Sequence, residues 1–227
     1  MLRHMWSTSP LFRLHSIKSY PTPLLLACTI GLRYWLALTR AICHDSTMNK
    51  ATIRSQLQSA RKQLTPAEVE QHSLATIKHI TASTLWADAN HVAIYLPCGG
   101  EIDLRSLLDV SDKHFYLPSI KGQHMQFQRW HHKLAINAHR FGMQQPDFIN
   151  ELPPTKLDLC LVPLVGFDGS GNRLGMGGGF YDRYFEHNDH TTLAGVAHQC
   201  QQVDSLPVDI WDVKLHHIFT EQGHHEF

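Results

Sequence analysis

Five glycines and several charged side chains gather in residues 171–185, which read GNRLGMGGGFYDRYF. Glycine carries no Cβ atom, so a ligand can approach the backbone closely there. Residues 180–185 are expected to begin a helix, whose first N–H groups lack partners within the helix and can bind an anion. Arg173 can bind phosphate oxygens, and Asp182 can hold the cation that accompanies a triphosphate. These residue types in this order predict a phosphate site.

The glycine loop taken alone leaves other interpretations open. It does not match the phosphate-loop pattern G-x-x-x-x-G-K-[ST], and Phe180 breaks the dinucleotide pattern G-x-G-x-x-G. The glycines also suit a turn that serves only tight packing. An aspartate in the first turn of a helix, such as Asp182, is favoured by the helix dipole in any case.

Charged residues elsewhere offer further ligand contacts. Lys50, Arg54 and Arg61 are spaced to project from one side of a helix, and this basic stripe matters only if the helix end packs near the glycine loop. Otherwise it is a solvated face. Glu101 follows two glycines after an expected strand, where α/β sheets present ligand-binding residues, and it can accept hydrogen bonds from an amino-substituted heterocycle or lie in a surface loop. Asp212 is either a second cation ligand or an ordinary exposed acid.

The elements that must position these residues alternate between helices and strands. Residues 49–64 carry apolar side chains at helical spacing, and Thr65 begins a second helix as its N-cap, followed by Pro66 and Glu68. A third helix is expected to start within residues 102–108. Six strands are expected at 91–97, 114–120, 125–130, 157–164, 191–198 and 214–220. This alternation predicts an α/β fold, a three-layer αβα domain with a mostly parallel central sheet.

The domain is expected to occupy residues 48–227, after an irregular N-terminal extension at 1–47. The extension has a single acid, Asp45, against five basic residues, and the composition changes at Met48. Its apolar stretch at 23–38 is short for a membrane span and is interrupted by Arg33. We interpret Met48 as the working start of the protein, with a membrane anchor as the alternative.

Overall composition limits the possible partners. The 227 residues carry 20 basic and 20 acidic side chains, so no global field attracts nucleic acid or an anionic membrane. The five cysteines form no C-x-x-C pair, which suits reduced thiols in the cytoplasm. The 18 histidines include three doublets without the spacing of a metal motif, and we expect them to be solvated or locally paired.

Four segments together resemble the 5-formyltetrahydrofolate cyclo-ligase family, also called methenyltetrahydrofolate synthetases, and particularly its bacterial branch. The glycine-rich segment VPLVGFDGSGNRLGMGGGFYDR resembles the family signature. It is supported by KATIRSQLQSARKQLT, VAIYLPCGGEIDLRSLL and LPVDIWDVKL, which follow the family order. The resemblance runs from about residue 49 to about residue 220 and covers none of residues 1–47.

The resemblance implies ATP- and Mg²⁺-dependent closure of 5-formyltetrahydrofolate to 5,10-methenyltetrahydrofolate, with release of ADP and phosphate after phosphorylation of the formyl oxygen. It makes Arg173 and Lys50 catalytic, and Asp182 and Asp212 magnesium ligands. The implied nucleotide contacts are Lys50, Arg54, Arg173, Leu174, Gly175, Met176, Gly177, Gly178, Gly179, Phe180 and Tyr181. The implied folate contacts are Arg54, Glu101, Met176, Gly177, Gly178, Gly179 and Phe180. The expected partners are these small molecules alone, with no nucleic acid and no membrane, bound by a monomer in the cytoplasm.

The sequence departs from the usual family pattern at Leu104, Gln145 and His216. Leu104 stands where a hydroxyl residue is common, and the other two stand where acids are usual. Two other functions are alternatives to the ligase. One is a sugar-phosphate isomerase or CoA-transferase-like enzyme, which needs no ATP, and the other is a membrane-tethered regulator with a decayed site.

Overall fold

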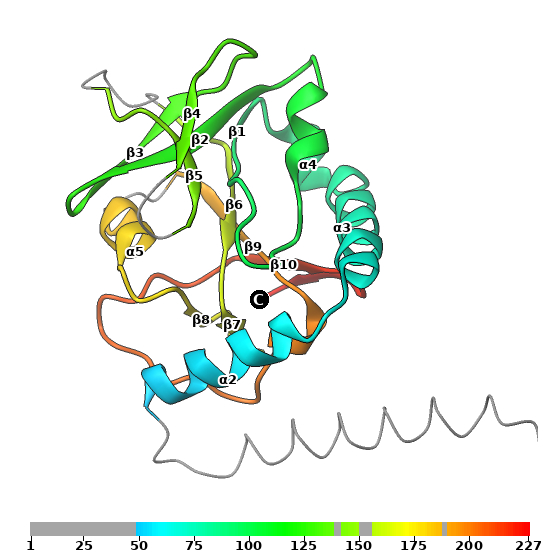
Figure 1. Cartoon of the computed structure of the whole chain (residues 1–227), viewed down its shortest axis with the longest axis vertical. Coiled ribbons are helices and arrows are strands. Elements are labelled where there is room, and N and C mark those ends of the chain that lie inside the picture. Colours follow the sequence, from blue (N-terminus) through cyan, green and yellow to red (C-terminus); the bar gives the residue numbers. More distant parts are fainter. Residues whose placement is uncertain (1–48, 139–141, 150–155, 188–189) are drawn as a thin grey trace, which may run out of the picture. The chain divides into compact units, whose positions relative to one another are not determined.

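The computed structural model describes residues 49–138, 142–149, 156–187 and 190–227, and within them one seven-stranded sheet forms the centre (Figure 1). The strand order is β11-β10-β9-β6-β1-β2-β3. Neighbouring strands from β10 to β2 pair in parallel, and each edge strand pairs antiparallel with its neighbour. The strands are β1 (His91–Ala93), β2 (His114–Lys121), β3 (His124–Arg129), β6 (Leu159–Pro163), β9 (Thr192–Val196), β10 (His217–Thr220) and β11 (Gly223–Glu226). The predicted mostly parallel sheet is confirmed.

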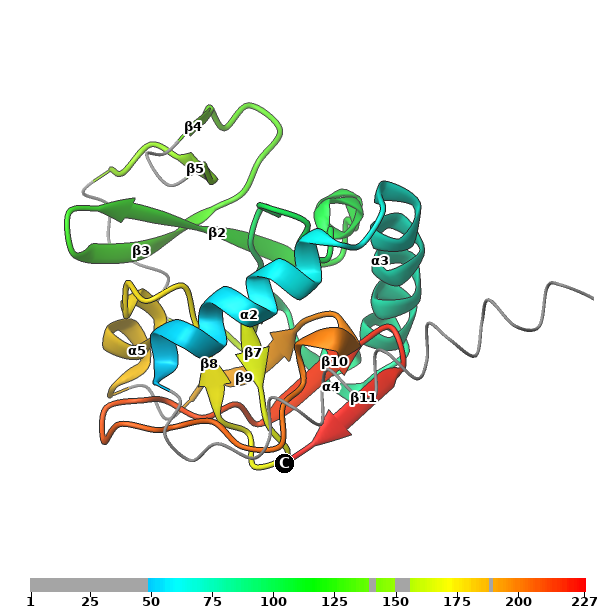
Figure 2. The same ribbon diagram turned by 60° about the horizontal axis from the view of Figure 1, so that its bottom comes forward.

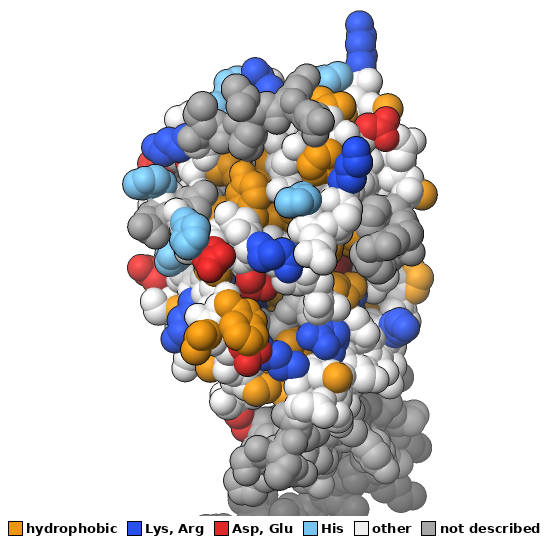
Figure 3. Space-filling model, turned by 90° about the vertical axis from the view of Figure 1, so that its left-hand side faces the viewer, with side chains coloured by type: hydrophobic (Ala, Val, Ile, Leu, Met, Phe, Trp, Pro, Cys, Tyr) orange, Lys and Arg blue, Asp and Glu red, His pale blue; other side chains and the backbone are white. Residues whose placement is uncertain are grey.

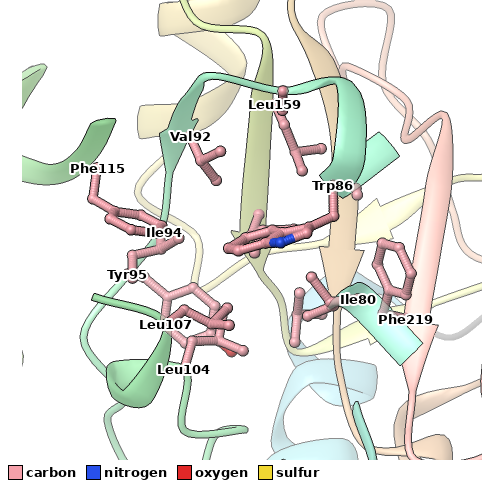
Figure 4. Packing of buried hydrophobic residues seen from close by; sticks show 14 of the residues in the cluster. Ile80, Trp86, Val92, Ile94, Tyr95, Leu104, Leu107, Phe115, Leu159 and Phe219 are labelled. Atoms are coloured by element: carbon pink, nitrogen blue, oxygen red, sulfur yellow. The ribbon is translucent and has the colours of Figure 1, made fainter. Parts of the chain in front are cut away.

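One face of the sheet packs on helices α3 (Pro66–Thr81) and α4 (Thr84–Asp88). Side chains alternate between the two faces of a strand, so Leu159 and Leu161 of β6 share this face. Trp86 of α4 lies among them, close to Ile80 of α3 (Figure 4). The predicted start of α3 is confirmed, because Thr65 and Glu68 form a reciprocal capping box.

The opposite face packs on the short helix α5 (Phe180–Phe185). Cys160 and Val162, which alternate with the leucines of β6, point to this side and share a cluster with Phe185. Helices on both faces give the three-layer arrangement. After the edge strand β3, β4 (Ile136–Ala138) and β5 (Gln144–Pro146) pair antiparallel with each other and form a separate two-stranded sheet.

Helix α2 (Lys50–Lys62) lies beyond the carboxyl end of β6 (Figure 1), across the hairpin of β7 (Gly166–Phe167) and β8 (Arg173–Leu174) (Figure 2). The Asn49 side chain caps it by accepting a hydrogen bond from the Thr52 backbone. Its apolar side belongs to a third cluster made of Ile53, Leu57, Val165, Leu174, Val203 and Leu206. Strand β8 ends at Leu174, directly before the glycines at 175–179. Because Leu174 packs against α2, the helix and these glycines lie close together.

Several expected elements differ in the structure. The expected third helix is a 3₁₀ helix, η1 (Arg105–Asp109), because Ile102 and Leu104 are buried in a non-helical segment before it. Helix α4, strand β11 and the β4–β5 and β7–β8 pairs were not predicted from the sequence. A further 3₁₀ helix, η2 (Gln199–Gln201), follows β9.

No helix within the described ranges is long and apolar enough to cross a bilayer. The apolar stretch at 23–38 and the proposed start at Met48 lie outside the described residues.

Candidate active site

Two cavities meet at the glycine loop, residues 175–179. We call the first the charged cavity. It has a volume of about 450 Å³ and is lined by Lys50, Arg54, Arg173, Leu174, Gly175, Gly177, Gly178, Gly179, Asp182, Arg183, Glu186, Asp209, Trp211 and Asp212. The second, the apolar cavity, has a volume of about 350 Å³ and is lined largely by aromatic and aliphatic side chains. Both cavities are lined by Arg173, Gly175, Gly178, Gly179 and Asp182. The loop is therefore a shared wall.

The backbone of the loop is accessible, as predicted. Gly177 and Gly178 are exposed, and Gly177 and Gly179 have φ angles of 97° and 62°, which side chains rarely adopt. The helix that follows has only six residues, so the dipole contributes less than a long helix would. Side-chain charges must supply most of the attraction for an anion. Basic and acidic side chains lie close together on the face that carries α5 and β3 (Figure 3).

The first turn of α2 lies against the loop. The Nε of Arg54 donates a 2.8 Å hydrogen bond to the carbonyl oxygen of Gly175. Its guanidinium group also lies where a Cβ atom on Gly177 would contact it, at 3.5 Å. The condition set by the sequence, that this helix end packs near the glycines, is met for Lys50 and Arg54.

Lys50 is held between two acids of the C-terminal segment. Its Nζ donates to Asp209, at 2.8 Å, and to Asp212. Burial lowers the pKa of Lys50, but the hydrogen bonds and charges of the two acids outweigh burial and raise the pKa above its ordinary value. Lys50 therefore stays charged at neutral pH.

Arg173 and Asp182 form a second ion pair, with an Nη2 to Oδ1 distance of 2.7 Å. Arg173 is buried, and its Nε has no hydrogen-bond partner among the described residues. A buried donor without a partner is costly, so it favours an acceptor that arrives with a ligand. Asp182 also accepts a 3.2 Å hydrogen bond from the backbone of Val213, which brings it beside the segment that carries Asp212.

Glu101 lines the apolar cavity, together with Tyr95, Leu96, Phe180 and Tyr181. Its Oε2 accepts a 3.0 Å hydrogen bond from the Cys98 backbone. Burial raises the pKa of Glu101, and the nearby Arg61 and the Cys98 hydrogen bond oppose this rise only in part. The Glu101 carboxyl group thus places a hydrogen-bonding group in a largely apolar cavity.

Arg61 does not join the basic stripe that its spacing predicted. It is 3% exposed and lies behind Glu101, with its Nη1 3.5 Å from the Glu101 carboxylate. Its Nε donates to the carbonyl oxygen of Gly99 at 3.1 Å. Helical spacing predicts that the three basic residues lie on one side of α2. The loop after β1, which contains Gly99 and Glu101, covers Arg61 in the last turn of that helix. Arg61 instead fixes the loop that carries Glu101.

The structure adds other residues that the sequence analysis missed. Asp209, Trp211 and Arg183 line the charged cavity, and Leu174, expected as a nucleotide contact, has its side chain buried in the third cluster. A second aspartate three residues before Asp212 was the available signal for Asp209.

The sequence model described as "5-formyltetrahydrofolate cyclo-ligase family" matches residues 46–221. The chain belongs to this family. The enzyme named 5-formyltetrahydrofolate cyclo-ligase in Haemophilus influenzae is 34% identical over 77% of this chain and 99% of its own length. The enzyme of the same name in Escherichia coli K12 is 33% identical over 72% of this chain and 96% of its own length.

Solved structures agree with this assignment. The NMR structure of 5,10-methenyltetrahydrofolate synthetase from Aquifex aeolicus is 30% identical, with a TM-score of 0.69 over 79% of this chain and 93% of its own. The Mycoplasma pneumoniae 5,10-methenyltetrahydrofolate synthetase has a TM-score of 0.61 at 24% identity over 77% of this chain and 99% of its own, and it supports the fold alone. The predicted family and enzyme class, a ligase of folate metabolism, are confirmed. The isomerase or CoA-transferase-like alternative is wrong.

The three departures from the cyclo-ligase pattern have structural explanations. Leu104 is fully buried, and His216 accepts a hydrogen bond from the Leu193 backbone. Gln145 lines the apolar cavity, and its amide bonds both the N–H and the carbonyl of Ile120 at 3.0 Å. An acid at this position could accept from the Ile120 N–H but could not donate to its carbonyl, so Gln145 suits this backbone.

Proposed function

We propose that the chain closes 5-formyltetrahydrofolate to 5,10-methenyltetrahydrofolate, using ATP and Mg²⁺ and releasing ADP and phosphate. The observation that carries this proposal is the shared wall between a charged cavity and an apolar one. A phosphoryl donor and a heteroaromatic acceptor can bind on the two sides of the glycine loop. Their reacting groups can then meet at the loop.

The chemistry explains why two cavities must meet. A formamide oxygen is a poor leaving group, so N10 of the folate cannot close onto the formyl carbon until that oxygen is activated. Transfer of the γ-phosphoryl group from ATP to the oxygen lets it leave as phosphate when the new C–N bond forms. This transfer requires mainly alignment and neutralisation of negative charge, and it needs no protein nucleophile.

The charged cavity is proposed to bind the nucleotide. Lys50, Arg54 and Arg173 supply cationic donors, and the exposed backbone of residues 175–179 allows close approach. The buried Nε of Arg173, which has no hydrogen-bond partner among the described residues, becomes a further donor to a phosphate oxygen if the guanidinium group turns toward the ligand. Arg173 and Lys50 are the proposed catalytic residues, because Arg173 can exchange its carboxylate partner, and Lys50 either of its two, for a phosphate group.

Two carboxylates in the same cavity fit a magnesium ion. Asp182 and Asp212 both line it, and carboxylate oxygens together with substrate phosphates are the ligands Mg²⁺ prefers. When bound, the ion would neutralise phosphate charge. In the chain itself, these acids hold Arg173 and Lys50 at the glycine loop, ready to contact the polyphosphate.

The apolar cavity is proposed to bind the folate. Phe180 and Tyr181 offer aromatic surfaces for the pterin, and Met176, half exposed on the loop, lines the same cavity and can also contact it. Glu101 can accept hydrogen bonds from the pterin N–H groups. Burial makes such a bond specific, since an incorrect ligand would leave the carboxyl group without a partner.

We also propose that the enzyme works as a monomer in the cytoplasm. All the residues assigned above to the two ligands come from one chain. Among the described residues, Cys98, Cys160 and Cys200 are free thiols, which suits a reducing compartment.

The test measures methenyl-folate absorbance after the purified protein is mixed with 5-formyltetrahydrofolate and Mg-ATP. A parallel reaction omits ATP. Arg173→Ala and Asp182→Ala are each expected to reduce the rate at least about tenfold, the equivalent of ~1.4 kcal/mol in the transition state. Arg105→Ala is the matched control, because Arg105 forms an exposed pair with Asp103 outside both cavities. Wild-type rates in both site variants, or turnover without ATP, would falsify the proposal.

A further inference from the structure

Three potential metal ligands meet outside both cavities. They are His72 of α3, His198 after β9 and Glu221 between β10 and β11. Their ligand atoms all lie within 4.8 Å of one another. The Nδ1 atoms of His72 and His198 are 3.0 Å apart, and the Nδ1 of His72 is 3.9 Å from Oε1 of Glu221. The sequence analysis found no metal spacing, because these residues come from three distant segments.

The hydrogen bonds of His198 determine which of its nitrogens can bind an ion. The side chain is fully buried, and its Nε2 lies 2.8 Å from the carbonyl oxygen of Gly100. A carbonyl oxygen only accepts, so Nε2 carries the hydrogen and Nδ1 of the neutral ring carries a lone pair. That lone pair faces His72. Metal-binding histidines are commonly oriented in this way, with the second nitrogen donating to a backbone carbonyl.

Glu221 is oriented in the same manner. Its Oε2 accepts a 2.9 Å hydrogen bond from the backbone of Gln199, which leaves Oε1 on the side of His72. The side chains of His72 and Glu221 are 23% and 15% exposed. An ion can therefore reach the group from solvent, while its ligands are held by the surrounding backbone.

The spacing of the ligand atoms is compatible with a small ion between them. A tetrahedral ion with ligands at 2.0–2.1 Å separates them by about 3.3 Å, which falls between the two separations found here. One proton shared by the two histidines explains the shorter separation. The carboxylate takes no part in that hydrogen bond, because 3.9 Å is too long for one to His72 and is the distance of an ion pair.

We propose that His72, His198 and Glu221 bind one divalent transition-metal ion, of which Zn²⁺ is the best match. Two imidazole nitrogens and one carboxylate are a common zinc ligand set, with a fourth position left for water. The ion would join α3 to the ends of β9 and β10. Through His198 it would also fix the carbonyl of Gly100, next to Glu101.

The test uses the full chain without an affinity tag, stripped of metal by a chelator that is then removed. Zn²⁺ is titrated in competition with a chromophoric chelator, and Co²⁺ is added separately to record its visible absorption. One ion per chain is expected, with a dissociation constant below about 1 μM. His72→Ala and Glu221→Gln are each expected to weaken zinc binding at least about tenfold. Both residues are partly exposed, so these variants should still fold, whereas replacing the fully buried His198 would disturb the core.

Two histidine controls separate this site from general binding by a histidine-rich chain. His124→Ala removes an exposed histidine of β3, and His224→Ala breaks a different pair, in which His224 lies 3.3 Å from His217. Both controls are expected to bind Zn²⁺ like the wild type. The proposal is overturned if His224→Ala abolishes binding, if His72→Ala leaves it unchanged, or if no ion binds below 1 μM.

Thermal unfolding provides a second readout that does not depend on activity. Zn²⁺ is expected to raise the melting temperature of the wild type and of both controls, but not that of His72→Ala or Glu221→Gln. A fall in melting temperature on His72→Ala without any response to Zn²⁺ in the wild type would mean a simple hydrogen-bonded group. That result also overturns the proposal.

Discussion

At the scale of single residues, the charged cavity pairs each proposed catalytic cation with one or two acids. Lys50 contacts Asp209 and Asp212, and Arg173 contacts Asp182. These pairs keep the cations extended toward the glycine loop before any ligand arrives. Positioning of this kind reduces the conformational entropy that binding must otherwise overcome.

Arg61 is predicted to be a positioning residue for Glu101. Arg61→Lys keeps the charge but removes the forked guanidinium that reaches both Gly99 and Glu101. We expect the KM for 5-formyltetrahydrofolate to rise about tenfold, with a smaller change in kcat and no change in the KM for ATP. Steady-state kinetics with each substrate varied in turn measures these effects. The control is Arg105→Lys, and a selective rise in the KM for ATP would contradict this role.

The raised pKa of Glu101 predicts a pH dependence of stability. Because the folded state binds this proton more tightly than the unfolded chain, the free energy of unfolding should fall as pH rises from the ordinary value of 4.5 through the raised pKa. Glu101→Gln lacks this contribution. Urea unfolding of both proteins between about pH 4.5 and pH 7 should show the wild type losing stability relative to the variant. Parallel curves would rule out the shift.

Residue-level reasoning from the sequence was strongest where short-range patterns determine geometry. The glycine loop, with Arg173 before it and Asp182 after it, lines the cavities as expected. The prediction that Arg61 belongs to the basic stripe was wrong, because helical spacing gives the direction of a side chain but not which segment covers it. The group of His72, His198 and Glu221 could not be predicted, because tertiary contacts alone bring its members together.

At the scale of elements, the site depends on close packing of α2 against the β7–β8 hairpin. A Cβ atom added to Gly166 would overlap the Cδ1 atom of Leu57, so a side chain at position 166 requires that Leu57 shift. The sequence indicated α2 through its apolar spacing. It did not indicate the hairpin, whose two-residue strands are too short to show any periodicity.

Gly166→Ala is therefore predicted to destabilise the protein by about 1–3 kcal/mol through overpacking. In a Leu57→Ala background the added methyl group would enter the space that the leucine leaves. The same substitution should then be nearly neutral or stabilising. Chemical unfolding of the four proteins of this double-mutant cycle measures the coupling. Gly169→Ala is the control, because nothing lies within 4 Å of its added Cβ atom. Additive effects of the two substitutions would refute the contact.

At the scale of the whole molecule, all proposed site residues lie within the part that follows Met48. The family match begins at residue 46, and the curated relative from Haemophilus influenzae is covered over 99% of its length. The alternation of strands and helices was enough to predict the layered fold and its mostly parallel sheet. Strand order was beyond reach, since it depends on which strands pair over long sequence distances.

A protein that begins at Met48 is predicted to keep the full rate of the longer chain and to be a monomer. The reason is that residues 49–227 contain every group assigned to ATP, folate and magnesium. Methenyl-folate absorbance and light scattering on both lengths of chain test this expectation. A loss of rate in the shorter protein would assign residues 1–47 a part in the reaction.

The wall shared by the two cavities also constrains the order of events during turnover. Because Gly175, Gly178 and Gly179 line both cavities, the phosphoryl group of the proposed reaction can pass directly from one substrate to the other, without a phosphorylated form of the protein. Both substrates must then be present together in a ternary complex. Double-reciprocal plots at several fixed ATP concentrations should accordingly give intersecting lines instead of the parallel lines of a ping-pong scheme.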